Sequence, residues 1–401
     1  MNPKSSHRVF PILFFTVLLG GLLIRCQSQQ SLQQTIDTNF SVAADQYRHM
    51  MELLPDDRFP QNYDYNTGEM ETSGSGWWCS GFYPGTLFYL YEETGAEDLY
   101  NEATRILSHL EKEQHNTSTH DLGFMMYCSF GNAHRINPKP EYREILINSA
   151  KSLSTRFNPT VGCIKSWDSD PDDFLVIIDN MMNLELLFWA TEATGDSSFY
   201  DIAVTHANTT IENHFREDTS SWHVLNYDPD TGEIQEKRTA QGYSDESAWS
   251  RGQSWGLYGF TVTYRETGDK KYLRQAEGIA NFLLNHPNLP EDKIPYWDYN
   301  APNIPDAKRD ASAGAIMASG LLELSQYASP EDSATYFATA ETIIRTLSTD
   351  EYMANVGTNG GFILKHSVGS KPADSEVDVA ITYADYYFVE AMRRYQDLTV
   401  E

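Results

Sequence analysis

The chain has 401 residues, of which 13% are aromatic, and it carries a formal net charge of −28. A chain of this length can bury a large core in one or two domains, and its aromatic content argues against intrinsic disorder. The acidic composition disfavours nucleic acid and anionic membranes as partners of the bulk surface. An anionic ligand would therefore need a local cationic group.

The first 26 residues have the pattern of an export signal. Lys4 and Arg8 precede an apolar stretch at 9–24, which is short for a spanning helix, and Cys26 then opens a polar stretch. The pattern resembles a bacterial lipoprotein signal with Cys26 as the lipidated residue, although Arg25 replaces the small residue that usually precedes such a cysteine.

We therefore expect a signal peptide at 1–26, a polar tether at 27–36 and one folded domain at 37–401. The protein would be exported and held by a lipid anchor, as a periplasm-facing or surface lipoprotein. A soluble periplasmic or secreted protein and a retained membrane anchor are the alternatives.

Apolar helical segments recur along the folded domain, and each ends at a glycine. The segments end at Gly95, Gly195 and Gly268, and a new helix begins within a few residues at an acidic or small polar residue. A fourth copy begins again at Pro330, which suits the first turn of a helix. The repeat indicates pairs of helices joined by short turns.

The two helices of a pair differ in character. Segments before the glycines, such as 181–190, are apolar almost all round, whereas those after them, such as 272–284, are amphipathic. About twelve helical segments lie between 31–54 and 377–394. The sequence predicts an all-α (α/α)6 barrel of inner and outer helices, with a solenoid of helical pairs as the alternative and one hairpin near 222–234.

Two carboxylates stand beside apolar segments. Asp121 precedes an apolar helix that starts near Met125, and Asp179 lies within the apolar stretch 176–183. Burial and a second carboxylate nearby both raise the pKa of a carboxyl group, so Asp179 is a candidate proton donor near neutral pH. A helix-capping role is the alternative for both residues.

The segment Trp249-Ser-Arg-Gly-Gln-Ser-Trp255 combines a cation with two indole rings. This combination suits a pocket that stacks a sugar ring on tryptophan and pairs its acid group with Arg251. The alternative is a helix start with an arginine whose stem covers apolar surface. His223 and Gln241 are unremarkable alone, and the polar segment 366–378 is either a substrate rim or a capped loop.

Together these motifs resemble the unsaturated glucuronyl hydrolases, glycoside hydrolase family 88. The matching residues keep their order along most of the chain; they are His120-Asp121, Gly123-Phe124, Ile178-Asp179-Asn180, Met182-Asn183, Trp222-His223, Gln241, Trp249-Ser-Arg-Gly-Gln253, Trp255, His366-Ser-Val-Gly-Ser-Lys371, Glu376-Val-Asp378 and Ala384-Asp385-Tyr386-Tyr387. The resemblance implies the (α/α)6 barrel and an oligosaccharide substrate that a polysaccharide lyase has left with a 4,5-unsaturated uronic acid. It also implies hydration of the C4=C5 bond, without attack at the anomeric carbon.

The resemblance further implies the roles of individual residues. Asp179 protonates C4 and then activates water for C5, and Asp121 is its partner carboxylate. The residues implied around the sugar are His120, His223, Gln241, Arg251, Trp78, Trp249, Trp255, Trp167, Ser367 and Ser370. Trp77 competes with Trp78 for its role, and Arg251 as the clamp of the uronate is our inference from its charge. No metal, organic cofactor or nucleic acid is implied.

The resemblance leaves the parent polysaccharide and the oligomeric state open, with glycosaminoglycans and ulvan as the main candidates for the polysaccharide. Family members that act on sulfated fragments carry a lysine two residues past the second serine of the Ser367–Ser370 loop, where this chain has Pro372. One alternative is the same chemistry on unsaturated galacturonyl substrates. Another is a surface lipoprotein that only binds glycans, against which the apolar setting of Asp179 argues, because binding does not require a protonated acid.

Overall fold

The folded unit of the computed structural model begins at Leu32, and the structure describes Met1, residues 31–170 and residues 172–399. The expected signal peptide and Cys26 lie outside the described residues. The expected tether is too long by five residues, because Leu32 and Ile36 are buried in the first helix. Along the described part of the chain, no helix combines the length and apolar character that a membrane crossing requires.

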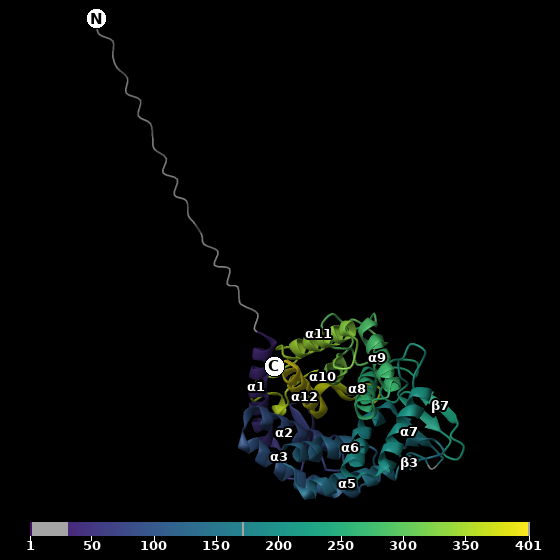
Figure 1. Ribbon diagram of the computed structural model, residues 1–401. Coiled ribbons are helices and arrows are strands. Elements are labelled where there is room, and N and C mark those ends of the chain that lie inside the picture. Colours follow the sequence, from purple (N-terminus) through teal and green to yellow (C-terminus); the bar gives the residue numbers. More distant parts are fainter. Residues whose placement is uncertain (2–30, 171, 400–401) are drawn as a thin grey trace. The chain divides into compact units, whose positions relative to one another are not determined.

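The described residues form twelve α-helices that alternate between an outer and an inner ring (Figure 1). The outer helices are α1 (Leu32–Leu53), α3 (Glu97–Leu110), α5 (Pro140–Ser154), α7 (Ser197–Asn213), α9 (Lys270–Asn285) and α11 (Pro330–Leu347). The inner helices are α2 (Phe82–Thr94), α4 (Asn132–Ile136), α6 (Leu184–Thr194), α8 (Ser250–Thr267), α10 (Ala311–Ser325) and α12 (Thr382–Thr399). A π-helix (Gly123–Gly131) leads into α4, and a 3₁₀ helix (Ile178–Asn183) leads into α6.

The inner ring closes on itself. Helix α2 contacts α4, the π-helix that leads into α4 contacts α6, and contacts then run from α6 to α8, α10 and α12, which returns to contact α2. Every residue of α10 is buried, which explains its apolar character on all sides. Ring closure confirms the predicted barrel and excludes the solenoid, which would leave its two ends unpaired.

The turns between inner and outer helices follow the predicted chemistry. Gly95, Gly195 and Gly268 cap α2, α6 and α8 in the left-handed conformation, with φ of 67°, 75° and 67°. Asp196 and Asp269 then accept hydrogen bonds from backbone N–H groups in the first turns of α7 and α9. These turns lie together at the rim where the inner helices end.

Two small sheets lie at the other rim, where the inner helices begin. The predicted hairpin is present, and β5 (Phe174–Ile177) extends β6 (Val224–Tyr227) and β7 (Ile234–Arg238) to an antiparallel sheet. A second sheet, which we did not predict, has the order β2-β1-β9-β8; its strands are β1 (Phe59–Asp64), β2 (Glu69–Ser73), β8 (Ser367–Ser370) and β9 (Ser375–Ile381). A short pair joins β3 (Phe157–Asn158) to β4 (Cys163–Ile164). Strand β9 runs directly into α12, so this sheet fixes the start of an inner helix.

Candidate active site

The starts of the inner helices carry the reactive side chains. Trp78 opens the turn before α2, Asp121 precedes the π-helix, and Asp179 lies in the first turn before α6. Arg251 and Tyr383 lie in the first turns of α8 and α12. Helix N-termini carry a partial positive charge, so this rim is electrostatically suited to an anionic ligand.

A cleft of about 630 Å³ opens at this rim and narrows to a deep pocket of about 90 Å³. The cleft and the pocket share the lining residues Trp78, His120, Asp121, Trp167, Gln241 and Arg251. Asp179 lies at the deep end, among the residues that line only the smaller pocket. The cleft volume is within the range of about 300–1,000 Å³ that is typical of small-molecule sites.

Asp179 is a buried carboxyl group whose side chain is 13% exposed. Burial is the largest cause that raises its pKa to about 7; the charge of Asp121 raises it further, and Arg251 opposes the shift. Its Oδ2 has no hydrogen-bond partner among the described residues. Near neutral pH, the group is therefore present in both the protonated and the ionised form, as a proton donor that later acts as a base requires.

His223 lies behind Asp179 and lines neither the cleft nor the pocket. Its Nδ1 accepts hydrogen bonds from the backbone N–H groups of Ala240 and Gln241, at 3.1 and 3.2 Å. The neutral ring consequently carries its proton on Nε2, which lies 3.8 Å from Asp179 Oδ2. Burial lowers the pKa of His223 well below its usual range, so the ring stays neutral. We predicted sugar contact for His223, and its position corrects this to a contact with the acid.

Asp121 and His120 form a second pair at the cleft wall. His120 Nδ1 donates to the Ser166 carbonyl at 2.8 Å, and its Nε2 lies 3.2 Å from Asp121 Oδ1. Burial raises the pKa of Asp121 and lowers that of His120. Because Nδ1 holds a proton, a neutral His120 would turn the lone pair of Nε2 toward Asp121 Oδ1, which is unfavourable if Asp121 is ionised. The contact is favourable when a proton lies between these two atoms, so the pair binds one proton jointly.

Arg251 is buried and already engaged. Its terminal nitrogens donate to the carbonyls of Val368 and Gly369, and one lies 3.3 Å from Asp310 Oδ2. Its guanidinium stacks 4.5 Å from the Trp249 ring centroid. Arg251 thus ties α8 to β8 and to the start of α10. Arg251 lines both the cleft and the pocket, where it supplies positive charge. Both of its terminal nitrogens, however, already donate hydrogen bonds to protein oxygens.

The tryptophans divide into two groups. Trp78 and Trp167 line the cleft and the pocket, and Trp77, which is 45% exposed, lines the outer cleft. Trp249 and Trp255 do not line either and are 2% and 0% exposed. Our prediction that they form stacking walls is wrong.

The buried indoles pack within the protein. Trp249 packs on His223, with centroids 4.4 Å apart, and Trp255 packs on Phe124 at 5.1 Å. Of the two serines, Ser370 lines the cleft, whereas Ser367 is fully buried away from it and cannot reach a sugar there.

Sequence reasoning missed two residues at the site. Tyr383 lines the cleft, and its ring lies 4.9 Å from that of Trp78. Asp310 caps α10 by accepting from Ser312 N–H and lies beside Arg251. The cap could have been found from the Asp310-Ala-Ser312 pattern before an apolar helix. The place of Tyr383 in the cleft has no local signal.

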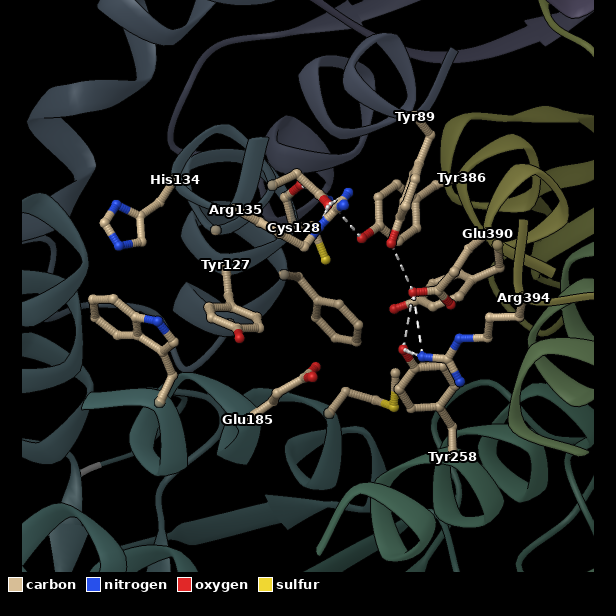
Figure 2. A pocket seen from close by; sticks show the side chains of 17 residues that line it. Tyr89, Tyr127, Cys128, His134, Arg135, Glu185, Tyr258, Tyr386, Glu390 and Arg394 are labelled. Carbon is tan, nitrogen blue, oxygen red and sulfur yellow. Dashed lines mark hydrogen bonds and ion pairs between the residues drawn. The ribbon is translucent and has the colours of Figure 1, made fainter. Parts of the chain in front are cut away.

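A separate cavity of about 360 Å³ lies toward the other ends of the inner helices (Figure 2). Its Glu390 accepts hydrogen bonds from Tyr89 and Tyr258, and Arg394 lies 3.5 Å away. Glu390 is seven residues beyond Tyr383 on α12, or about 10 Å along the helix axis. The cavity shares only Phe124 with the deep pocket and holds none of the site residues above.

Comparisons with known proteins agree with this description of a sugar-sized acidic cleft in an (α/α)6 barrel. The model of Glycosyl Hydrolase Family 88 matches residues 54–397. The chain belongs to this family and is an enzyme, a glycoside hydrolase.

Three relatives show how close the resemblance is. The chain is 42% identical to the unsaturated glucuronyl hydrolase of Formosa agariphila over 97% of this chain and 99% of that one. A crystal structure of an unsaturated glucuronyl hydrolase specific for heparin is 45% identical with a TM-score of 0.88, covering 91% of this chain and 97% of that one. The unsaturated glucuronyl hydrolase of Bacillus sp. GL1 is 29% identical with a TM-score of 0.85, with the same coverage.

Proposed function

We propose that this enzyme is an unsaturated glucuronyl hydrolase that removes the 4,5-unsaturated uronic acid from the non-reducing end of oligosaccharides made by polysaccharide lyases. The observation that carries the proposal is a carboxyl group of pKa about 7 at the end of a sugar-sized cleft. Protonation of a vinyl ether carbon requires such an acid, whereas sugar binding alone does not.

In the proposed reaction, Asp179 transfers its proton to C4, and positive charge develops at C5 and the ring oxygen. The Asp121 carboxylate, when the proton it shares with His120 lies on the imidazole, stabilises this charge. Ionised Asp179, which faces the Nε2–H of His223, next takes a proton from water as the water oxygen bonds to C5. The product is a hemiketal at C5, which opens to a ketone and releases the remaining sugar. The positive charge of Arg251 and the partial charges of the helix N-termini attract the uronate carboxylate.

We propose glycosaminoglycan fragments as the substrate class. A mutant of the Streptococcus agalactiae unsaturated glucuronyl hydrolase, 31% identical with a TM-score of 0.79 over 92% of this chain and 94% of that one, has been crystallised with dGlcA-GalNAc6S. The relative with 45% identity is described as specific for heparin. Ulvan fragments end in the same unsaturated sugar and are the second class to test, because the acidic composition suits a saline habitat.

The experiment follows the ultraviolet absorbance of the conjugated double bond with unsaturated chondroitin, heparin and ulvan disaccharides. Wild-type enzyme consumes the absorbance. We expect the Asp179→Asn variant to lose at least about a hundredfold in kcat, because an amide cannot transfer the proton. Asp201→Asn, an exposed change on α7, is the matched control. Full activity of the Asp179→Asn variant would refute the assignment of the acid.

We also propose that the enzyme is exported and lipidated at Cys26, on the strength of the residue pattern at 1–34 alone. In a bacterial host that processes lipoproteins, the wild-type protein should sediment with membranes, and the Cys26→Ala variant should be soluble or unprocessed. Equal amounts of both proteins in the soluble fraction would rule out the anchor.

A further inference from the structure

A second groove, of about 350 Å³, lies beside the cleft. We call it the side groove; it is lined by Tyr243, Trp297, Pro302, Asn303, Asp306, Ala307, Lys308, Lys371 and Pro372. Two chain segments connect it to the cleft. In the first segment, Gln241 lines the cleft and Tyr243 lines the side groove. In the second, Ser370 and Ala373 line the cleft, and Lys371 and Pro372 between them line the side groove.

The side groove has an aromatic corner. Tyr243 is 50% exposed, among the largest exposed fractions for an apolar or aromatic side chain in the described residues. Its ring meets Trp297 edge to face, with centroids 6.4 Å apart and an angle of 86° between the planes. An exposed ring beside a second ring offers the apolar surface on which a pyranose stacks.

The backbone of the exposed Tyr243 is hydrogen-bonded to a buried carboxylate. The Tyr243 N–H donates to Asp298 Oδ2 at 2.8 Å, and the same oxygen accepts from Ser247 Oγ at 2.7 Å. Asp298 is fully buried. The backbone that carries the Tyr243 ring is consequently fixed, which reduces the entropy cost of binding a ligand.

A lysine stands next to this corner. Lys308 is held by Asp378 at 2.6 Å, whereas Lys371 pairs at 3.0 Å with Asp374, whose side chain is 85% exposed. Exposed ion pairs contribute little free energy, so Lys371 can exchange Asp374 for an anionic group of a ligand at small cost. In a chain of net charge −28, an aromatic corner with an exchangeable cation is suited to an acidic sugar.

We propose that the side groove is a distal subsite for an acidic sugar of a longer lyase product, whose unsaturated end occupies the cleft. The inference rests on the proposed function above. The acidic group is a uronate carboxylate or a sulfate ester, and Lys371 binds it while Tyr243 stacks on the ring. A disaccharide held in the cleft does not reach the side groove.

The test compares unsaturated di- and tetrasaccharides of unsulfated hyaluronan and of sulfated chondroitin as substrates. We expect Tyr243→Ala and Lys371→Ala each to raise the tetrasaccharide KM about two- to tenfold, with kcat and the disaccharide KM unchanged. Lys270→Ala, which removes an exposed cation at the start of α9, is the matched control and should change neither KM.

A larger effect of Lys371→Ala on the sulfated tetrasaccharide would identify sulfate as the bound group, and equal effects would identify the uronate. The subsite proposal is overturned if the tetrasaccharide KM does not change, or if both KM values rise in parallel. Failure of the wild-type enzyme to act on any unsaturated disaccharide would instead contradict the proposed function.

Discussion

Asp179 shows how a single side chain sets the working pH of the enzyme. Its carboxyl group is buried, which raises its pKa, and the charge of Asp121 raises it further, to about 7. The protonated form, which is needed for the first step, dominates below this pH. A raised pKa in an acid thus gives activity at low pH and loss of activity as the pH rises.

We expect kcat/KM of the wild-type enzyme to fall about tenfold per pH unit above a pH near 7. Asp121→Asn removes a charge that raises the pKa of Asp179, so the falling limb of the profile should move to lower pH, together with a loss of rate. The measurement is a pH profile of kcat/KM for both proteins on one disaccharide. A limb that stays at the same pH would show that Asp121 does not influence the acid.

The two carboxylates lie at the starts of two helices that pack together, and the spacing of these helices depends on a glycine. A Cβ on Gly123 would lie 2.5 Å from the Cα of Asn183, so the π-helix packs directly on the 3₁₀ helix that carries Asp179. Asn183 Oδ1 also accepts a hydrogen bond from the Phe124 N–H at 3.1 Å. This contact fixes the distance between Asp121 and Asp179.

We expect Gly123→Ala to lower the free energy of unfolding by about 1–3 kcal/mol and to reduce kcat, because the two helices must move apart. Gly256→Ala is the control: the nearest atom, at 3.4 Å, is the end of the Ile279 side chain, and alanine favours a helix. Chemical denaturation and disaccharide kinetics measure both effects. Equal stability of the two variants would contradict the role of Gly123.

The elements also show why prediction from the sequence succeeded only in part. The turns at Gly95 and Asp196 depend on local chemistry, which a short sequence window contains. The sheet of β8 and β9 was missed because it pairs with β1, more than 300 residues earlier, and because residues such as Glu376 adopt positive φ. The direction of Trp255 was mistaken because every residue of α8 from Ser250 to Thr263 is buried, so the sequence has no periodicity from which to choose a face, and Trp249 stands just before the helix as its N-cap.

At the scale of the whole molecule, two electrostatic effects oppose each other. The net charge of −28 repels an anionic oligosaccharide at long range, whereas Arg251 and the helix N-termini attract it inside the cleft. Salt screens the long-range repulsion more than the buried attraction, since the screening length is about 10 Å at 0.1 M.

We therefore expect kcat/KM for a disaccharide to rise when the salt concentration increases from about 0.01 M to 0.1 M, with kcat unchanged. Initial rates at several salt concentrations measure this. A steady decrease in kcat/KM would mean that the surface near the cleft attracts the substrate and that the overall charge is not decisive.

The direction of α1 has a consequence for how the enzyme would stand on a membrane. Near its start, Asp37 accepts a hydrogen bond from Gln396 at the end of α12, and near its end, Tyr47 donates to Asp385 at the beginning of α12. The chain therefore enters the barrel on the side away from the catalytic mouth. A membrane attachment ahead of Leu32, as we propose through Cys26, would therefore leave the opening of the cleft accessible to polysaccharide fragments.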